Sequence, residues 1–176
     1  MKKFDPINQR LQLGQMAGAV SSCIFCQIAH NSTSTTLLHS QPTHYIGTLT
    51  KLFGPRRMTR LSHFKISNLL LSGGRHYLVI PVEHISTVRN LQSREEDYTL
   101  VNHMLSVGKM LLHRDAPQSK EYRFGFHQPP LNSVDHLHLH CLALPFQPTW
   151  KHIKYLSLGP LGFIEAEKLL EKIKPT

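Results

Sequence analysis

Residues 133–142 read Ser-Val-Asp-His-Leu-His-Leu-His-Cys-Leu, and this stretch decides the fold. Histidines alternate there with apolar residues, and alternate side chains of a β-strand share one face. We therefore predict a strand over residues 136–144. One face of that strand carries three histidines: His136, His138 and His140. The other face is apolar and is expected to pack on the core: Leu137, Leu139 and Cys141.

Three interpretations fit this pattern of histidines. The first is a half-buried strand whose outward residues are simply polar. The second is a bare metal site, although at ~3.3 Å per residue His136 and His140 stand ~13 Å apart, so only an adjacent pair could bind one ion. The third is catalysis, because imidazole is a good nucleophile near neutral pH. A central histidine could attack phosphorus, form a covalent phospho-imidazole and leave water to complete the reaction.

The sequence around this stretch predicts an α+β domain. Residues 76–82 are rich in β-branched and aromatic residues and residues 122–127 alternate, so both are predicted strands. A helix is predicted to begin at Ser93, three residues before Glu96 as in a capping box, and to stop before Pro117. Gly108 lies on the apolar stripe of this helix, where close packing is expected. A second helix is predicted over residues 164–173. Helices segregated from hairpin-like strands are typical of α+β folds.

Length and composition fit one globular domain. The 176 residues are 40% hydrophobic and 18% charged, and they include only 3 cysteines. Too few cysteines for a disulfide scaffold and no secretory segment favour a cytoplasmic or nuclear location, with an organelle as the alternative. No apolar run approaches the ~20 residues of a spanning helix, so we expect no membrane partner. We expect residues 1–20 to form a flexible tail and residues 21–176 a single domain.

The net charge of +9 belongs to the first part of the chain. Residues 1–75 contain nine Lys and Arg against a single acid, Asp5, whereas residues 76–176 contain 11 bases against 10 acids. Residues 40–75 have no acid and no clean period, and we expect them to be an atypical, poorly ordered segment. A basic nucleic-acid-binding module is one interpretation of this charge. The chain has no basic patch interleaved with aromatic residues, so we do not expect nucleic acid as a partner.

Three motifs, in order, resemble the histidine triad (HIT) superfamily of nucleotidyl hydrolases and transferases. They are Cys23-Ile-Phe-Cys26, His76-Tyr-Leu-Val-Ile-Pro-Val-Glu-His84, and the histidine strand with Ser133-Val upstream. The longer string of residues 124–140 is similar to the HINT-like branch, including plant forms similar to adenylylsulfatases. The resemblance covers residues 22–39 and 76–173. It implies an antiparallel sheet of about five strands with two helices, commonly paired as a homodimer across the long helix and an edge strand.

The resemblance also implies roles for the catalytic histidines. His138 would be the nucleophile that carries the nucleotidyl group. His140 would contact the phosphate and steady His138. His76 would complete the set of active-site histidines, to which His136 of the triad also belongs. No metal or other cofactor would be required for catalysis.

Substrates in the family are AMP conjugates such as nucleoside phosphoramidates and adenosine phosphosulfate. Ser133 would bind the α-phosphate, and Asn132 is a further candidate for substrate binding. His127 is a pocket candidate too, although a satisfied strand histidine would fit equally well. The family's ribose-binding aspartate has no counterpart, because residues 40–75 contain no Asp or Glu and Asn68 is their conspicuous amide near the end. The alternative to an active enzyme is therefore a catalytically weak or inactive nucleotide-binding or regulatory variant.

The Cys23-x₂-Cys26 pair leaves several interpretations open. Such a pair can be redox-active, can be merely buried, or can supply half of a tetrahedral zinc site. Some members of the family bind structural zinc at matching positions, and there His84 and His136 would complete a Cys₂His₂ set. This site would tie the N-terminal segment to the sheet. Cys141, on the apolar strand face, is expected to be a packed core thiol.

Overall fold

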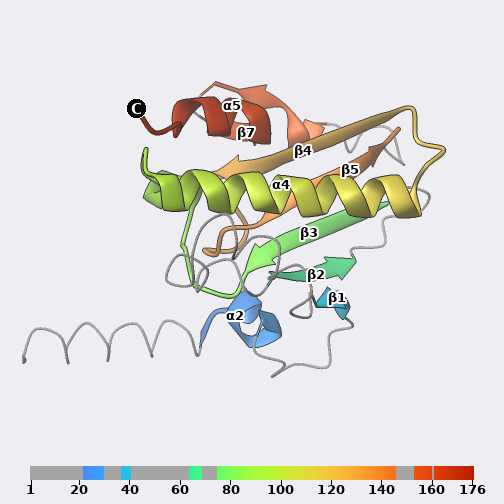
Figure 1. The fold of residues 1–176 in the computed structure, drawn as a ribbon, viewed down its shortest axis with the longest axis horizontal. Coiled ribbons are helices and arrows are strands. Elements are labelled where there is room, and N and C mark those ends of the chain that lie inside the picture. Colours follow the sequence, from blue (N-terminus) through green and yellow to red (C-terminus); the bar gives the residue numbers. More distant parts are fainter. Residues whose placement is uncertain (1–21, 30–36, 41–63, 69–74, 146–152, 160) are drawn as a thin grey trace, which may run out of the picture.

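One antiparallel sheet of seven strands organises the chain, in the order β1-β2-β3-β5-β4-β7-β6 (Figure 1). The computed structural model describes residues 22–29, 37–40, 64–68, 75–145, 153–159 and 161–176. The strands are β1 (Leu37–Ser40), β2 (Phe64–Asn68), β3 (His76–Pro81), β4 (Glu121–Gln128), β5 (Leu139–Leu144), β6 (Ser157–Leu158) and β7 (Leu161–Glu165). The helices are α2 (Ile24–Ala29), the 3₁₀ turn η2 (Val88–Asn90), α4 (Glu95–Asp115) and α5 (Ala166–Lys172).

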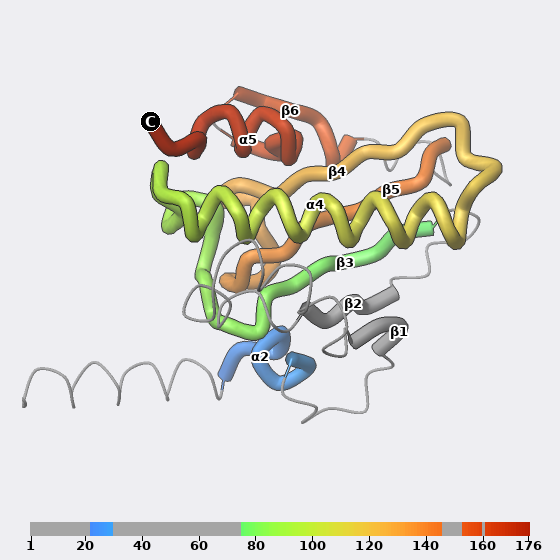
Figure 2. The backbone as a smooth tube through the Cα atoms, in the orientation of Figure 1, coloured from blue at the N-terminus to red at the C-terminus, as the bar shows by residue number. Residues whose placement is uncertain are grey.

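The long helix α4 lies across one face of the sheet, with α5 beside it, whereas α2 lies near β2 and β3 (Figure 1). The tube in Figure 2 shows the chain leaving β3, passing through η2 into α4 and returning along β4. The core lies between α4 and the strands, where Val79, Leu139 and Met104 are fully buried. A smaller apolar cluster joins α2 to the other face of β3. The α+β class predicted from the sequence is the class observed.

Helix α4 begins two residues later than the sequence predicts, and the predicted capping box at Ser93 is wrong. Arg94 is the N-cap residue and makes no side-chain cap. The Ser93 hydroxyl instead donates to the Lys172 carbonyl of α5, at 3.5 Å. Buried Asp97 organises this end of the helix, because its carboxylate accepts from the Gln92 amide at 2.9 Å and from Arg94 Nε at 2.7 Å. A carboxylate in the first turn also suits the positive end of the helix dipole.

Gly108 lets α4 approach the sheet closely, as its place on the apolar stripe predicted. A Cβ atom at this position would lie 2.5 Å from Cys141 Sγ. Cys141 is fully buried in the same core, so the expectation of a packed core thiol also holds.

The C-terminal region holds a strand that the sequence analysis missed. The predicted helix over residues 164–173 is wrong at its start, because β7 runs to Glu165 and α5 begins only at Ala166. The alternation of residues 161–165 explains the difference: Phe163 is buried on the histidine face, whereas Ile164 packs against the core on the α4 face. β7 pairs with β4, so β4 is an inner strand of the sheet.

Part of the segment that the sequence analysis treated as atypical forms a sheet strand. β2 pairs antiparallel with β3 over five residues, from Phe64 opposite Pro81 to Asn68 opposite Tyr77. The backbone groups on that edge of β3 therefore have partners in β2. The remainder of residues 40–75, apart from Ser40 in β1 and Arg75, lies outside the described residues, as does the predicted tail of residues 1–20.

Candidate active site and metal cluster

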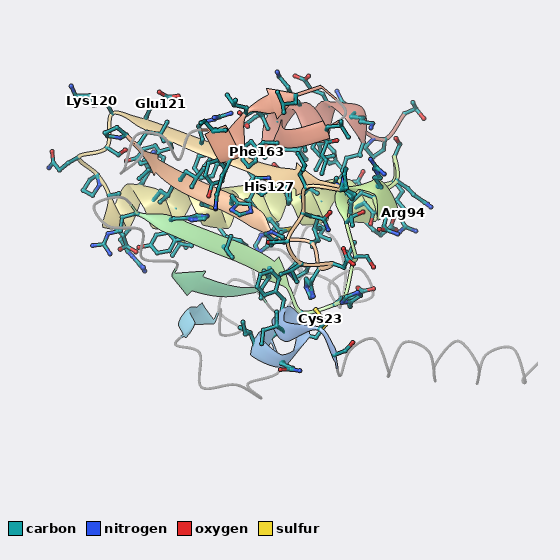
Figure 3. All side chains as sticks on the ribbon, turned by 180° about the vertical axis from the view of Figure 1, so that it is seen from behind. Cys23, Arg94, Lys120, Glu121, His127 and Phe163 are labelled. Carbon is teal, nitrogen blue, oxygen red and sulfur yellow. The ribbon has the colours of Figure 1, made fainter. Side chains whose placement is uncertain are left out.

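Four histidines meet on the sheet face opposite α4, the face seen in Figure 3. His76 comes from β3, His127 from β4 and His140 from β5, and His138 lies immediately before β5. The strand register brings them together, because His140 lies opposite Leu78 of β3 and opposite Gly125 of β4. His127 and Phe163 are labelled close together on this face in Figure 3, and their ring centroids are 5.4 Å apart.

The strand predicted over residues 136–144 begins only at Leu139. The three preceding residues lie beside the loop after β3 instead, since the Leu137 amide donates to the Ile85 carbonyl at 2.5 Å. Leu137 is nevertheless buried in the core with Leu139. The alternation therefore continues past the end of the strand, and His136, His138 and His140 are all buried.

One hydrogen bond fixes the tautomer of His138. Its Nδ1 lies 2.6 Å from the His136 carbonyl oxygen, which can only accept, so Nδ1 carries the proton. The lone pair is therefore on Nε2. Burial lowers the pKa of His138, with the bond to the carbonyl acting in the opposite direction. The ring is held between Phe25 of α2, at 5.2 Å between centroids, and His140, at 4.9 Å. His138 thus presents a neutral, oriented nitrogen with nucleophilic character.

His76 and His140 form a buried pair beside His138. His76 Nε2 and His140 Nδ1 are 2.8 Å apart, and the rings are stacked with centroids 5.0 Å apart. Burial, followed by the charge of nearby His138, lowers the pKa of His76 to about 4 and that of His140 well below 6.5. His140 Nε2 and His76 Nδ1 have no hydrogen-bond partner among the described residues. Buried polar atoms of this kind are usually satisfied, so they mark a place for a polar ligand.

His127 completes the group from β4. Its ring centroid lies 4.7 Å from that of His140, and burial lowers its pKa to about 4, with smaller contributions from His138 and Lys154. A small pocket beside His138 is lined by residues that include His127, Phe126 and Asn132. The Asn132 amide donates to the Asp135 carboxylate at 2.7 Å, which orders the loop at the pocket rim. Ser133 lies exposed in that loop.

A second cluster lies between α2 and the loop after β3. Cys23, Cys26, His84 and His136 offer ligand atoms that all lie within 4.8 Å of one another. Three of the distances are short: Cys26 Sγ to His84 Nδ1 at 3.2 Å, Cys26 Sγ to His136 Nδ1 at 3.4 Å, and Cys23 Sγ to His136 Nδ1 at 3.5 Å. Ligand atoms bonded to one tetrahedral zinc ion at ~2.0–2.3 Å stand ~3.3–3.8 Å apart, and these three distances are close to that spacing.

The orientation of His136 also suits a metal ligand. Its Nε2 lies 2.9 Å from the Pro81 carbonyl oxygen, so Nε2 carries the proton and the lone pair of Nδ1 points at the two cysteines. A backbone carbonyl that orients the second ring nitrogen is typical of histidines that bind metal. Both ring nitrogens of His136 are therefore engaged away from His138, although His136 lies only two residues before it.

Sequence reasoning missed three aromatic residues of the site: Phe25, Tyr155 and Phe163. Phe25 lies inside the Cys-x₂-Cys motif, and its ring packs on His138 and, at 5.9 Å, on His136. Phe163 falls in the strand that was taken for a helix. Tyr155 stands in an irregular stretch with no periodic signal, and the structure places it in a 3₁₀ turn of residues 153–155.

A fold of this kind, with histidines brought together from β3, β4 and β5, defines an enzyme of the histidine triad type. A family model described as "Scavenger mRNA decapping enzyme C-term binding" matches residues 22–155. A bifunctional adenosine 5'-phosphosulfate phosphorylase/adenylylsulfatase of Arabidopsis thaliana is 56% identical over 161 residues, which cover 91% of this chain and 97% of that protein. The chain belongs to the histidine triad superfamily, as its sequence motifs predicted.

Further comparisons agree with this assignment. An adenosine 5'-monophosphoramidase of Xenopus tropicalis is 31% identical over 155 residues, covering 87% of this chain and 88% of that protein. Among solved structures, a HIT family hydrolase from Legionella pneumophila Philadelphia 1 has a TM-score of 0.51 at 23% identity, covering 73% of this chain and 97% of that chain. A histidine triad protein from Clostridium difficile has a TM-score of 0.50 at 20% identity, covering 70% of this chain and 91% of the other. These two structures confirm the fold, and the curated relatives confirm that the chain is a HIT-family enzyme.

Proposed function

We propose that this chain cleaves AMP conjugates, of the phosphoramidate or adenosine phosphosulfate type, through a nucleotidyl group carried covalently on His138. The observation that carries the proposal is the hydrogen bond from His138 Nδ1 to the His136 carbonyl, which leaves the Nε2 lone pair for attack. The curated relatives support the substrate class, because their names state activity on adenosine 5'-phosphosulfate and adenosine 5'-monophosphoramidate.

The reaction proceeds in two displacements at phosphorus. His138 Nε2 attacks the α-phosphorus, the Nε2–P bond forms, and the bond from phosphorus to the leaving group breaks with its electron pair going to the leaving group. An amine leaving group takes a proton from solvent, whereas sulfate leaves as the dianion without one. Water then attacks the same phosphorus and releases a proton to solvent, the Nε2–P bond breaks with its electron pair returning to Nε2, AMP leaves, and His138 returns to its neutral form. Where inorganic phosphate replaces water as the acceptor, the second step is a nucleotidyl transfer.

The His76–His140 pair is positioned to bind the phosphoryl oxygens. His140 Nε2 and His76 Nδ1 are buried and have no partner among the described residues, so either can donate to an oxygen that gains charge in the transition state. His127, Asn132 and Ser133 would extend substrate binding from β4 and the adjoining loop. His136 belongs to the catalytic set only through its carbonyl, which orients His138.

Replacing the nucleophile tests the proposal. His138→Asn should abolish turnover of an AMP phosphoramidate and of adenosine phosphosulfate, and wild type mixed with substrate and quenched rapidly should gain one adenylyl group by mass spectrometry. His113→Asn, at an exposed histidine of α4, is the matched control and should keep full activity. Equal turnover by His138→Asn and wild type would contradict the proposal.

The same experiment separates the alternative function. A catalytically weak nucleotide-binding or regulatory protein would bind AMP in calorimetry while wild type shows no turnover of either substrate. The alternative rests on the acid-free composition of residues 40–75. A basic nucleic-acid-binding module is a lesser alternative, and it would show binding to DNA that weakens strongly with salt.

We also propose that Cys23, Cys26, His84 and His136 hold a structural zinc ion. The donor set and its spacing support the proposal, because two sulfur and two imidazole nitrogen atoms are the ligands that a structural zinc prefers. Burial and neighbouring Cys23 raise the pKa of Cys26 to about 12, so a cation is needed to favour its thiolate at neutral pH. The ion would supply stability at the α2 end of the molecule and would take no part in the reaction.

A further inference from the structure

We propose that the C-terminal segment of residues 153–165 completes the active site within the same chain, with Tyr155 as the positioning residue for the His76–His140 pair. The proposal rests on the proposed function for the role of that pair as a phosphoryl-binding group. It concerns residues beyond the HIT motif, and its support comes from how this segment is docked on β4 and what it places over the histidines.

The segment is anchored to β4 through β7. β7 pairs with β4 from Gly125 opposite Glu165 to Gln128 opposite Gly162. Gly125 provides the space, because a Cβ atom there would lie 2.5 Å from Cε1 of Phe163. Arg123 of β4 forms an ion pair with Glu165, and its guanidinium lies 5.3 Å from the centroid of the Phe163 ring. The aromatic side chains of the segment are therefore held in a fixed place against the sheet.

Tyr155 is the residue of this segment that touches most of the histidine group. Its ring centroid lies 5.5 Å from His127, 5.6 Å from His140 and 6.0 Å from His76. Phe163 supports it from behind at 5.4 Å, with the two rings nearly perpendicular at 89°. Tyr155 is only 5% exposed, and together with Phe163 and Leu142 it forms a separate apolar cluster. This cluster therefore forms a buried aromatic wall beside His76, His127 and His140.

The wall keeps water from the His76–His140 pair. Imidazole is charged less readily where burial removes its hydration, so a dry wall keeps both rings neutral at working pH. A neutral pair places no positive charge beside His138, whose ring becomes positively charged when Nε2 bonds to phosphorus. A protonated pair would oppose that step by repulsion between like charges. The titratable groups facing the pair are His138 before β5, His127 of β4, and Tyr155 with Lys154 of the 3₁₀ turn, where Lys154 acts on His127.

Three variants test the role of Tyr155: Tyr155→Ala, Tyr155→Phe and, as the matched control, Tyr122→Ala. Tyr122 also belongs to the sheet but packs on the core of the α4 side, away from the pocket. In Tyr155→Ala we expect the imidazole NMR signals of His76 and His140 to titrate at higher pH than in wild type. Activity needs the neutral pair and falls as pH falls through its pKa, so the acid limb of kcat should move to higher pH and kcat at pH 6 should drop several-fold. Tyr155→Phe and Tyr122→Ala should keep the wild-type acid limb.

Each outcome decides the proposal. Unchanged titration of His76 and His140 in Tyr155→Ala would overturn it, and so would a change in KM alone with an unmoved acid limb. If Tyr155→Ala does not fold, Phe163→Leu opens the same wall from behind and should give the same shift. If wild type shows no turnover of AMP conjugates, the proposed function fails, and the NMR titration still decides whether Tyr155 holds the pair neutral.

Discussion

His136 and His138 are separated by one residue, but they have different roles because each ring donates a hydrogen bond to a different backbone carbonyl. The Nδ1–H group of His138 donates a hydrogen bond to the carbonyl of His136, which leaves a lone pair on Nε2. The Nε2–H group of His136 donates a hydrogen bond to the carbonyl of Pro81, so the lone pair of Nδ1 points toward Cys23 and Cys26. The alternating sequence predicts that both are on one side of the chain. It contains nothing that distinguishes the two tautomers, which depend on backbone groups far away in sequence.

The role of His140 can be isolated by removing one of its nitrogens. In His140→Asn, the amide can still bond to His76 near the former position of Nδ1, but the buried Nε2 is lost. If Nε2 donates to the phosphoryl group, we expect kcat/KM for an AMP phosphoramidate to fall about 10²–10³-fold, as for loss of one oxyanion donor. Circular dichroism and thermal unfolding serve as controls for the fold. Wild-type kinetics in His140→Asn would contradict a contact between Nε2 and substrate.

Elements with a strong period were predicted better than those decided by long-range pairing. The core of α4, including the close approach at Gly108, follows from helical spacing alone. β7 could not be recognised, because its five residues are too short for a clear period. Its partner β4 also lies far away in sequence, since Glu165 pairs with Gly125, 40 residues earlier. Long-range pairing is also why the sequence alone did not predict that Tyr155 and Phe163 pack beside the histidines. Local spacing therefore predicted that His136, His138 and His140 share one side of the chain, and the family resemblance added His76. The contacts of Tyr155 and Phe163 with them depend on the sheet order.

The contact of α4 with β5 gives a prediction at the scale of elements. Gly108→Ala gains about 1 kcal/mol of helix propensity, but its Cβ would meet Cys141 Sγ at 2.5 Å, with Phe124 at 3.4 Å. We expect a net loss of about 1–3 kcal/mol in the free energy of unfolding by urea, because overpacking forces the sheet and helix apart. Cys141→Ala removes the clash, so the double variant should be more stable than the sum of the two single changes predicts, by at least about 0.5 kcal/mol. Strict additivity would show that Sγ is not what limits the approach.

At the scale of the whole molecule, one side of the sheet is completed by strands from the C-terminal part of the chain. β7 and β6 cover the outer edge of β4, so among the described strands the outermost are β1 and β6. A dimer that continues the sheet would have to use one of these, and the homodimer stays a prediction that sedimentation can check.

None of the described helices is long and apolar enough to cross a membrane. Most of the excess positive charge of residues 1–75 lies outside the described residues, and the cytoplasmic or nuclear location stays a prediction.

A zinc ion in the proposed cluster would tie the N-terminal part of the chain to the sheet, since Cys23 and His136 are 113 residues apart. It would add to the apolar contacts of α2 with β3. A ligand that binds only the folded state stabilises it by about 4 kcal/mol when its concentration is about 1,000 times Kd. We therefore expect purified protein to contain one zinc ion per chain by mass spectrometry. Chelation at neutral pH should lower the free energy of unfolding by several kcal/mol, and added zinc should restore it.

Cysteine variants assign that stability to the cluster. Cys26→Ser should lose the zinc and most of the chelator effect, because Cys26 Sγ lies 3.2 Å from His84 Nδ1 and 3.4 Å from His136 Nδ1. Cys141→Ala removes the core thiol and leaves the cluster intact, so it should keep its zinc and remain sensitive to chelation. The predicted role for His138 requires that the phosphoryl chemistry does not depend on the ion. Chelated protein that remains folded at low temperature should therefore still form the adenylyl adduct, and complete loss of the adduct in such protein would mean that the cluster also holds His138 in place through His136.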